Sequence, residues 1–600
     1  MHTTRISATN NGQNQSKKAR QQMMAWTALP TDSEWPRWSD YLQNRKHPRP
    51  LRKLVPKGSV CPLLWGPLER AHSDASFSLF LELAAASCRK KAARQAGLED
   101  RLETWLAGSV AAVPDLPFAL ECLAWAHLLP SLAALVTPAV WRDLFMLLVN
   151  TAHEAVGLSI EGDATVHELL AAELPLTLAY YFPELPQTKK LYRAGCRAVT
   201  RNVVELTDGE GQPSGRMLGM FRFLLASWTR CRLLARAARW SCWDKEAELQ
   251  YAWTIQQAIR LTRRDGTQVL TEGMAANWCP GLFSALLDMF GDAADRAIAR
   301  QLLPGTRFAN QANKQKKMPA PPLHSEWAEI CVMRTAWARK APCLTTVFCA
   351  QTLRSELSTQ GRVVWSGDCT PRLRVNAQEQ NVKSDWRELC WFTDEDVDYL
   401  ELQGEYSGDW LIQRQILLSR SDHFLLLADA ILGPETGELE VQTSLPLRAG
   451  MHWYQDPEVR DGVLGDDRAL AAVMPLALPQ WTAEKAAGEL ACAAQQLQLT
   501  QTGNGQALYA AWFFDLAPAR LAKPRTWRRL TVAAQRVVQK PDAAVGFRVQ
   551  VGRRQWLIYR SLQPAANRSV LGQNLSQEFV AARFNTDGHI EPLIEIEASD

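Results

Sequence analysis

The sequence predicts two halves of different fold class, an all-α half followed by an antiparallel β half. From about Ser59 to Pro304, apolar residues recur every three or four positions, which is the period of amphipathic helices. Beyond Ser325 the apolar period drops to two, as in strands that bury one face. A chain of 600 residues also asks for more than one core.

Composition excludes several classes of protein. The 47% hydrophobic and 22% charged fractions are those of an ordinary folded chain, and they exclude disordered, collagen-like and mucin-like proteins. The 67 basic and 63 acidic side chains give a formal charge of only +4. Since phosphate neutralisation needs a concentrated basic face, we do not expect a nucleic-acid partner.

The N-terminal 25 residues are polar and contain no apolar core of a secretory signal, so we expect a disordered tail over residues 1–25. The longest apolar stretch, Leu116 to Val136, contains Glu121, His127 and Pro130, which indicates buried helices rather than a membrane span. The 13 cysteines show no Cys-x-x-Cys spacing. We therefore expect neither structural zinc nor a disulfide framework, and a cytoplasmic location unless the start is misassigned.

The helical half is predicted to span residues 26–303, with a Pro- and Lys-rich linker over 304–325. Short breakers such as Pro114, Pro130 and Pro183 separate the helices, so neighbours should be antiparallel. A plain bundle and an α/α toroid of helical hairpins both fit. The predicted helices are Phe77–Gln95, Phe118–Leu129, Pro138–Val156, Val166–Tyr181, Thr188–Leu206, Arg216–Trp240, Glu246–Arg263 and Leu282–Leu302.

The second half, residues 326–600, is predicted to be an antiparallel β-sandwich. Two strands, Trp410–Leu418 and His423–Ile431, flank the polar turn Ser419-Arg420-Ser421-Asp422, which is a hairpin signal. Ala483–Leu497 is predicted as a helix inside the sandwich. The other predicted strands lie at 329–333, 344–348, 362–365, 397–402, 545–551, 555–561, 578–583 and 591–596.

Three segments resemble one family, the heparinase II/III-like polysaccharide lyases. In the hairpin, Arg414 opens an apolar strand and the second strand is expected to end at Asp429, as in that family. Glu326 to Trp337 resembles the family's first sandwich strand, and Thr188–Leu206 with Asp208-Gly209 resembles the helix and turn before its catalytic segment. The resemblance implies an α+β multidomain chain, with an incomplete N-terminal α/α toroid and a C-terminal antiparallel β-sandwich.

The resemblance also implies β-elimination beside a uronic acid, which requires a neutralised carboxylate, a base and an acid. His167 falls where the family places an Asn/His motif at a helix start, and Glu210 follows Asp208-Gly209. We take His167 and Glu210 as catalytic candidates; a helix cap or a packed side chain is the alternative for His167. Pro213 and Leu218 stand where the family has Glu and Tyr.

The family's His-Gly-His-Ala-Asp segment, which supplies a histidine and sometimes zinc ligands, has no counterpart here. No histidine lies between Trp337 and Trp365, and the loop that would hold it is expected to be shortened to Ala350–Gly361. His452, beside Trp453 and Tyr454, has a cleft-like composition but also fits a surface loop. We therefore expect no metal and no cofactor.

Basic and aromatic side chains suggest an anionic glycan as partner. Arg232, Arg236 and Arg239 follow a helical spacing of four and three and so share a face. Arginine binds carboxylate or sulfate bidentately, and tryptophan stacks on sugar rings. A salt-bridged face with tryptophans in the core is the alternative, and Arg260, Arg263 and Arg264 beside Asp265-Gly266 extend the same possibility. The candidate substrate-binding residues are Arg216, Arg232, Arg236, Trp243 and Tyr251.

Other chemistry finds little support in the sequence. No phosphate-binding P-loop, dinucleotide fingerprint or nucleophile elbow is present, and carboxylate pairs such as Asp466/Asp467 fit solvated loops better than glycoside hydrolysis. The 23 tryptophans divide into 12 before the linker and 11 after it, so they form no single aromatic platform. Two hypotheses remain: a lyase acting on uronate-containing glycan, or a non-catalytic protein that binds glycan or a protein partner. The oligomeric state is left open.

Overall fold

The computed structural model describes residues 28–56, 59–66, 75–88, 97–109, 112–271, 278–305, 318–585 and 588–597. These residues form two compact units. The first unit comprises residues 1–212, 220–256 and 274–292, and the second comprises 213–219, 257–273 and 293–600. The predicted disordered tail and most of the predicted linker lie outside the described residues.

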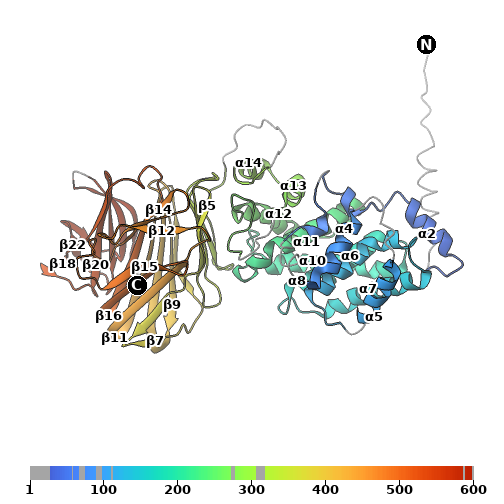
Figure 1. The fold of residues 1–600 in the computed structure, drawn as a ribbon, viewed down its shortest axis with the longest axis horizontal. Coiled ribbons are helices and arrows are strands. Elements are labelled where there is room, and N and C mark those ends of the chain that lie inside the picture. The colour runs from blue at the N-terminus through green and yellow to red at the C-terminus, as the bar shows by residue number, and fades with distance from the viewer. Residues whose placement is uncertain are drawn as a thin grey trace, which may run out of the picture. The chain divides into compact units, whose positions relative to one another are not determined.

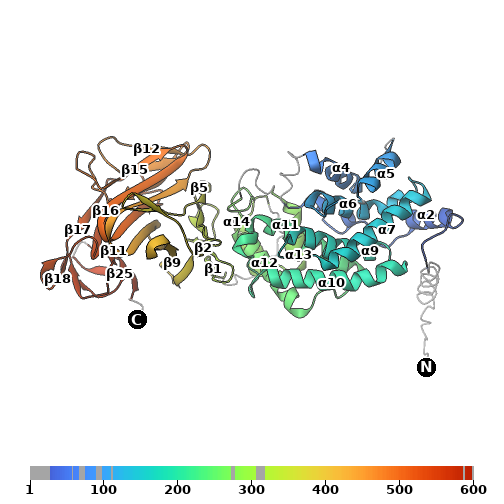
Figure 2. The same ribbon diagram turned by 90° about the horizontal axis from the view of Figure 1, so that it is seen from below.

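Helices make up the first part of the chain, as predicted (Figure 1). Helices α6, α7, α9 and α10 pack side by side in the first unit (Figures 1 and 2). The helices are α2 (Trp35–Asn44), α4 (Ser78–Ser87), α5 (Leu98–Ser109), α6 (Leu116–Leu132), α7 (Pro138–Glu154), α8 (Ala164–His167), α9 (Leu174–Tyr181), α10 (Pro186–Leu206), α11 (Leu218–Ala238), α12 (Lys245–Arg260), α13 (Pro280–Met289) and α14 (Ala293–Leu302).

Three details of the helical half differ from the prediction. The single helix predicted over Leu282–Leu302 is two helices, α13 and α14. The chain breaks at Gly291, which packs so closely on Leu287 that a β-carbon at Gly291 would lie 2.7 Å from a Leu287 side-chain atom. The prediction also missed α2, which Pro36 starts in its first turn, and α5.

The core of the first unit explains many of its tryptophans. Trp38, Trp125, Trp141 and Trp228 are all nearly inaccessible to solvent. Trp38 and Trp141 meet edge to face with ring centroids 6.1 Å apart. The structure also joins Cys61 and Cys88 in a disulfide with Cα atoms 5.9 Å apart, a single bridge that the prediction of no disulfide framework did not anticipate.

Antiparallel sheets make up the chain from β1 onward, as predicted (Figure 1). The second unit contains these sheets and also helix α14. The first sheet has the order β1-β2-β3-β4-β5, and the central sheet has the order β12-β13-β14-β16-β11-β10-β9-β8. The strands of these two sheets are β1 (Leu323–Ser325), β2 (Ile330–Arg334), β3 (Cys343–Val347), β4 (Arg354–Thr359), β5 (Arg362–Asp368), β6 (Arg372–Val375), β7 (Gln378–Gln380), β8 (Arg387–Thr393), β9 (Val397–Tyr406), β10 (Trp410–Ser419), β11 (Phe424–Pro446), β12 (His452–Gln455), β13 (Gly462–Gly465), β14 (Ala469–Pro475), β15 (Gly488–Ala493) and β16 (Gln496–Asp515).

Two further sheets follow in the same unit, with orders β17-β20-β21-β24-β25 and β19-β18-β22-β23. Apolar side chains fill separate cores: Trp365 and Trp512 belong to one, and Trp527 and Trp556 to another. The stacked arrangement is the predicted sandwich. The strands are β17 (Arg525–Leu530), β18 (Val532–Ala534), β19 (Val537–Val538), β20 (Ala544–Val551), β21 (Arg554–Ser561), β22 (Arg568–Val570), β23 (Gln573–Leu575), β24 (Phe579–Phe584) and β25 (Ile590–Ile596).

The hairpin of β15 and β16 replaces the helix predicted at Ala483–Leu497 (Figure 1). That segment forms β15, a turn and the start of β16, with Leu490 opposite Leu499 across the ladder. Ala494 and Gln495 take positive φ angles of 49° and 58° and close the hairpin. Alanine favours helices locally, but strand pairing determines the structure here.

The predicted hairpin of β10 and β11 is confirmed, although β11 continues beyond Asp429 to Pro446. Arg414 lies opposite Asp429 and binds it with two hydrogen bonds, Nε to Oδ1 at 2.5 Å and Nη2 to Oδ2 at 2.8 Å. Both side chains are almost completely buried. Thr443 donates a further hydrogen bond to Asp429 at 2.7 Å, and Arg414 Nη1 donates to the Cys369 carbonyl at 3.1 Å. The charges of this pair therefore balance.

Candidate functional site

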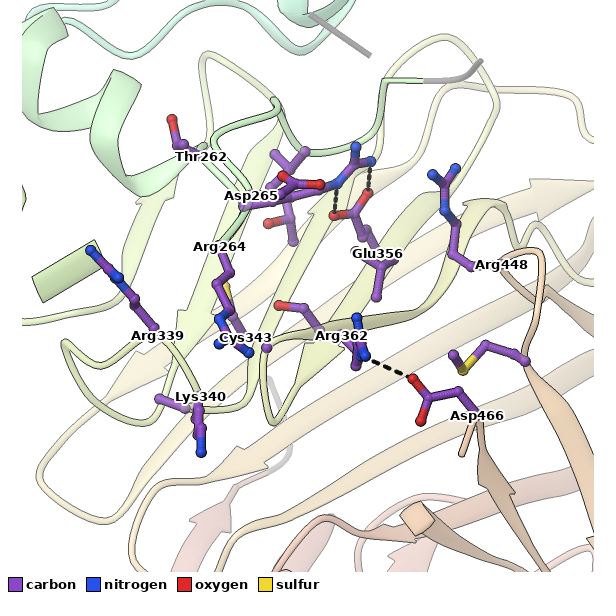
Figure 3. A pocket seen from close by; sticks show the side chains of 18 of the residues that line it. Thr262, Arg264, Asp265, Arg339, Lys340, Cys343, Glu356, Arg362, Arg448 and Asp466 are labelled. Carbon is purple, nitrogen blue, oxygen red and sulfur yellow. Dashed lines mark hydrogen bonds and ion pairs between the residues drawn. The ribbon is translucent and has the colours of Figure 1, made fainter. Parts of the chain in front are cut away.

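A pocket of about 760 Å³ lies wholly within the second unit, and we call it the Arg264 pocket (Figure 3). It is formed by the segment after α12, the loop between β2 and β3, the hairpin of β4 and β5, and the loops around β12 and β13. Basic side chains dominate its lining. They are Arg263, Arg264, Arg334, Arg339, Lys340, Arg362, Arg448 and Arg468, against the acidic residues Asp265, Glu356, Asp466 and Asp467.

Glu356 on β4 anchors the segment that follows α12. Its carboxylate accepts hydrogen bonds from Arg263 Nε at 2.7 Å and Nη2 at 2.5 Å, from the Leu270 amide at 2.8 Å, and from the Ser366 hydroxyl at 2.8 Å. Arg263 and Glu356 are both buried. Because Glu356 already satisfies Arg263, this pair holds the backbone in place rather than offering charge to a ligand.

The Asp265-Gly266 sequence forms a tight turn. The Gly266 amide donates to the Arg263 carbonyl at 3.0 Å, and the Arg263 amide donates to the Thr267 carbonyl at 2.8 Å. Asp265 accepts hydrogen bonds from the amide and hydroxyl of Thr267 at 2.9 and 2.6 Å. The carboxylate of Asp265 therefore stabilises its own turn, which directs Arg264 into the pocket (Figure 3).

Arg264 lies across the turn between β4 and β5. Gln360 and Gly361 at this turn have φ angles of 51° and 77°, the pattern of a two-residue type I′ hairpin. A β-carbon at Gly361 would lie 2.5 Å from Arg264 Cδ and 2.7 Å from Nη1. Gly361 therefore serves both the turn and the close approach of Arg264. Half of the segment Ala350–Gly361, predicted as a shortened loop, is strand β4.

The opposite wall of the pocket is held by contacts between two turns. Arg362 Nε forms an ion pair with Asp466 Oδ2 at 2.9 Å (Figure 3). Arg468 Nη2 donates to the Gln360 carbonyl at 3.1 Å, and Gln360 Nε2 donates to the Ala469 carbonyl at 3.1 Å. These contacts occupy Arg362 and Arg468 and fix the wall.

Three cations of the pocket, Arg264, Lys340 and Arg448, form no ion pair with any described residue. They come from three segments far apart in the sequence (Figure 3). Arg264 and Lys340 are exposed and Arg448 is half-buried. None of the described residues that line the pocket is a histidine or a tyrosine. The chemistry that these side chains supply is the binding of an anion.

His167 lies in the first unit, at the end of α8, where a π-helical turn (Glu168–Glu173) links α8 to α9. The predicted helix over Val166–Tyr181 is thus continuous but changes its winding. His167 is buried, and its Nδ1 has no hydrogen-bond partner among the described residues. Burial, with a smaller contribution from the charge of Arg201, lowers the pKa of His167, so its ring is neutral at pH 7.

The π-helical turn brings two glutamates to one buried cluster. Hydrogen bonds that run from i to i+5 place residues five apart nearly in line, so Glu168 and Glu173 reach the same hydroxyl of Ser227, at 2.8 and 2.7 Å. Glu173 also binds Arg230 through two hydrogen bonds, at 2.5 and 2.8 Å. Asn202 donates to the other oxygen of Glu168 at 2.5 Å.

This cluster contains one more carboxyl group than it has cations. Ser227 has a single proton and can donate to only one of its two carboxyl neighbours. Burial raises the pKa of Glu168 to about 8, although hydrogen bonds from Asn202 and Ser227 oppose the rise. Glu168 is therefore a neutral acid at pH 7. In this protonated state Glu168 can donate to the Ser227 hydroxyl at 2.8 Å, which frees the single Ser227 proton for the carboxylate of Glu173.

The other predicted site residues do not gather around His167. Glu210 is exposed, with its amide bonded to Asp208 in the turn after α10, and Arg216, in the second unit, pairs with Asp385 at 3.3 Å. Arg232 pairs with Glu248 and lies over Trp243, 5.9 Å from the ring centroid. The predicted roles of all these residues stay predictions.

Buried aromatic residues explain two of the predicted binding positions differently. Trp243 and Tyr251 are buried and pack edge to face at 4.5 Å. The Tyr251 hydroxyl lies 2.9 Å from that of Thr229, and burial raises the pKa of Tyr251. Arg236 instead lines a second pocket in the first unit, with Arg49, Lys53, Arg239 and Trp240, which we call the Trp240 pocket.

Sequence reasoning missed several residues that the fold brings together. Lys340 and Arg448 have no motif around them, and only the folded loops place them beside Arg264. His324, in the segment predicted as linker, lies on β1, contacts Glu388 and stacks on Trp391 with centroids 4.8 Å apart. His452 is exposed on β12.

Two general features of the described residues bear on function. No group of three or more histidine, cysteine or acidic side chains within them is arranged to hold a metal ion. None of the helices within them combines the length and apolarity needed to cross a membrane.

A helical toroid followed by stacked antiparallel sheets defines the polysaccharide lyase fold. The chain is similar to heparinase III, with a TM-score of 0.55, 12% identity, and coverage of 78% of this chain and 80% of that one. It is similar to the heparan sulfate lyase HepC from Pedobacter heparinus, with a TM-score of 0.51, 12% identity, and coverage of 88% and 94%.

A third similar structure is the chondroitin AC lyase of Streptomyces coelicolor in complex with chondroitin sulphate. Its TM-score is 0.51, the identity is 11%, and the match covers 95% of this chain and 91% of that one. No protein-family model matches the sequence. No curated protein matches it either. At these identities the likeness shows the fold.

Proposed function

We propose that this chain binds an acidic glycan of the glycosaminoglycan class in the Arg264 pocket. The observation that carries the proposal is the set of three cations, Arg264, Lys340 and Arg448, that converge on one pocket without forming an ion pair with a described carboxylate. Convergent cations without partners repel one another, so their arrangement is favourable only when an anion joins them.

The geometry of the pocket suits carboxylate or sulfate groups carried on a sugar chain. A guanidinium group can donate two parallel hydrogen bonds to either anion, whereas the ammonium of Lys340 acts as a mobile point charge. At about 760 Å³ the pocket can hold several sugar units, since ligand pockets typically measure about 300–1,000 Å³. Arg263 and Arg362 stay bound to Glu356 and Asp466 and keep the walls in place.

The similar structures support the class of ligand. Their names specify heparan sulfate and chondroitin sulphate, which carry both carboxylate and sulfate groups. This chain shares their fold across most of its length. An acidic glycan is therefore the natural occupant to test first.

A second candidate function is β-elimination itself, with His167 and Glu210 as the proton-transfer residues. A base would remove the C5 proton of a uronate, the C4–O bond would break with formation of a C4–C5 double bond, and an acid would protonate the leaving oxygen. The observation that favours it is a neutral His167 whose Nδ1 is unprotected by any hydrogen bond from the described residues. Glu168, beside it, carries a proton at pH 7.

One experiment tests the proposal and separates the two candidates. The purified full chain is titrated calorimetrically with heparan sulfate and chondroitin sulfate oligosaccharides, while ultraviolet absorbance records unsaturated uronate. We expect saturable binding at this pocket that becomes at least about a hundredfold weaker in Arg264→Ala/Arg448→Ala, because each lost charged hydrogen bond contributes about 1.5–3 kcal/mol. Arg528→Ala/Arg553→Ala removes two exposed arginines elsewhere in the second unit and should leave the affinity unchanged.

A charge-neutral variant sharpens the test. Gly361→Ala keeps every cation but places a methyl group 2.5 Å from Arg264 Cδ, so Arg264 must move. We expect weaker binding in this variant with Arg448 intact. Equal affinity in the wild type, Gly361→Ala and Arg264→Ala/Arg448→Ala would contradict the proposed site.

An absorbance rise with either glycan would establish elimination. In that case His167→Ala and Glu210→Gln should each abolish the rise while leaving calorimetric binding in place. Full activity in His167→Ala would instead remove His167 from the reaction.

A further inference from the structure

The first unit contains a second cation-rich pocket that the proposed function does not use. The Trp240 pocket has a volume of about 910 Å³ and lies between the segment after α2, the end of α9 and the C-terminal end of α11. It is at the opposite end of α10 from the Asp208-Gly209 turn, and 21 helical residues span about 30 Å. The pocket is therefore remote from the residues predicted to be catalytic at that turn.

Four exposed cations surround this pocket: Arg49, Lys53, Arg236 and Arg239. None of them forms an ion pair with a described residue. The carboxylate that lines the pocket, Glu184, is buried and bound by Arg45 Nη1 at 3.1 Å and by the Tyr41 hydroxyl. The charge of Glu184 is thus neutralised by Arg45, and the four exposed cations give the pocket a clear positive excess.

An aromatic surface lies beside these charges. Trp240 is half-buried and packs against Tyr192, with centroids 4.5 Å apart, and against Tyr180 at 6.4 Å. Tyr180 is itself fixed by a hydrogen bond from its hydroxyl to the Arg49 carbonyl at 2.9 Å. The indole is held in place from behind, and a flat ring of this kind stacks on the apolar face of a sugar.

The backbone at the end of α11 supports a binding role for Arg239. The Trp240 amide donates to the Ala235 carbonyl at 2.8 Å and the Arg239 amide donates to the Arg236 carbonyl at 3.2 Å, which is a Schellman motif. In this motif the residue in the left-handed region is usually glycine, but here Arg239 occupies it with a φ of 60°. An arginine in this conformation costs more free energy than a glycine would, which indicates that the side chain of Arg239 has a role of its own.

We infer that the Trp240 pocket is a second binding site for an acidic oligosaccharide, separate from the Arg264 pocket. Arg236, Arg239, Lys53 and Arg49 hold the carboxylate or sulfate groups, and Trp240 stacks on a sugar ring between them. The inference takes its ligand class from the proposed function but uses different residues in a different unit.

The experiment isolates this pocket by silencing the other one. In the Arg264→Ala/Arg448→Ala background, calorimetry with a heparan sulfate hexasaccharide should still show one site per chain. Adding Arg236→Ala/Arg239→Ala should weaken that site at least about tenfold. Adding Arg193→Ala/Arg197→Ala, which removes two exposed arginines of α10 outside the pocket, should leave it unchanged.

Trp240 distinguishes a sugar site from a simple anion site. Trp240→Ala should weaken hexasaccharide binding several-fold in the same background, with inorganic sulfate binding unaffected. Cations at a helix C-terminus also stabilise the helix, but that role would lower the unfolding midpoint without changing affinity. Lys53 also lines the pocket but is not part of α11, so Lys53→Ala cannot act through the stability of that helix. This variant should weaken binding as well, which shows that the effect of the double variant is not a folding defect.

The outcomes are distinct for the two sites. No binding in the Arg264→Ala/Arg448→Ala background, with binding in the wild type, would overturn the inference and leave the proposed function standing. Loss of all wild-type binding on Arg236→Ala/Arg239→Ala alone would support the inference and overturn the proposed function. Equal effects of the pocket variant and the α10 control, or equal loss of sulfate and hexasaccharide in Trp240→Ala, would overturn the inference.

Discussion

Both units bury arginines in bidentate bonds with carboxylates, and the Arg414–Asp429 pair of the second unit differs from the Arg230–Glu173 pair of the first by one proton in its surroundings. In the second unit, Arg414 binds Asp429, and Thr443 donates its hydroxyl to that single carboxylate. In the first unit, Arg230 binds Glu173, and Ser227 lies between Glu173 and a second carboxyl, Glu168. In the sheet pair one cation faces one anion. The helical cluster contains, besides such a pair, a neutral carboxyl group that can still ionise.

The difference shows how a second carboxyl group can protect a buried arginine against the loss of its carboxylate partner. A buried ion pair contributes little net stability, but removing one partner leaves an uncompensated charge in a medium that solvates it poorly. Asp429 is the one carboxylate that Arg414 binds among the described residues, while the charge of Glu168 acts on Arg230 in addition to that of Glu173. The helical cluster can therefore replace a lost anion by releasing a proton.

The largest effect is expected for Asp429→Asn. This variant keeps the shape of the side chain but leaves Arg414 buried without a counter-charge, which should cost about 3–5 kcal/mol of unfolding free energy. Urea denaturation measures the change. Glu440→Gln, on the same strand, breaks the exposed Arg374–Glu440 pair instead and should cost less than about 1 kcal/mol.

Glu173→Gln should cost less than Asp429→Asn, roughly 2–3 kcal/mol, because Glu168 can ionise and compensate Arg230. The pKa of Glu168 should fall in this variant, so the pH dependence of stability between pH 5 and 8 should flatten. Denaturation at several pH values checks this. An equal loss in the two variants would show that Glu168 gives no protection.

Ser227→Ala should cost about 1–3 kcal/mol, since it leaves the proton of Glu168 buried without a partner, although Glu173 keeps both of its hydrogen bonds from Arg230. Thr443→Val, its counterpart in the sheet, should cost less because Asp429 keeps both hydrogen bonds from Arg414. Thermal or urea unfolding of the two variants compares them directly. A larger loss for Thr443→Val would contradict the proton chain through Ser227.

The smallest effect at pH 5 is expected for Glu168→Gln, below about 1 kcal/mol, because the amide replaces a group that is already neutral. Below the ordinary pKa of 4.5 both the folded and unfolded states hold the proton, and between 4.5 and about 8 only the folded state does. Stability of the wild type therefore falls as pH rises through this window and levels off above it. Glu168→Gln should lack this component.

The variant and the wild type should consequently diverge with increasing pH, with the variant the more stable at pH 8. Urea midpoints at pH 5, 6.5 and 8 provide the measurement. Parallel pH profiles for the two proteins would show that Glu168 is ionised in the fold.

The order of helices and strands could be predicted because it depends on local periodicity. The helix over Val166–Tyr181 and the hairpin of β10 and β11 both follow from apolar spacing. The helix predicted over Ala483–Leu497 was wrong. Its alanines favour a helix locally, but the segment forms a strand because it pairs with β16, and this pairing is not visible in the local sequence.

The candidate site was less predictable because its residues come from distant segments. The spacing of Arg232 and Arg236 predicted that they share one helix face. It did not show that Glu248 pairs with Arg232, or that Arg236 lines a pocket. Lys340 and Arg448 carry no local signal. Glu168 and Glu173, five residues apart, fall on different faces of an α-helix, so only the π-helical turn reveals them as neighbours.

The π-helical turn Glu168–Glu173 also sets the orientation of everything that follows it in the same helix. A π-helical turn holds about one residue more than an α-helical turn, so its six residues turn the chain about as far as five α-helical residues do. Deleting one residue within this turn would therefore allow ordinary α-helix to form, while Leu174–Tyr181, including Tyr180 of the Trp240 pocket, would keep the faces that they present to their neighbours. Such a deletion would thus disturb α9 less than a deletion within a regular helix would, and its effect would fall on the contacts of Glu168 and Glu173 with Ser227.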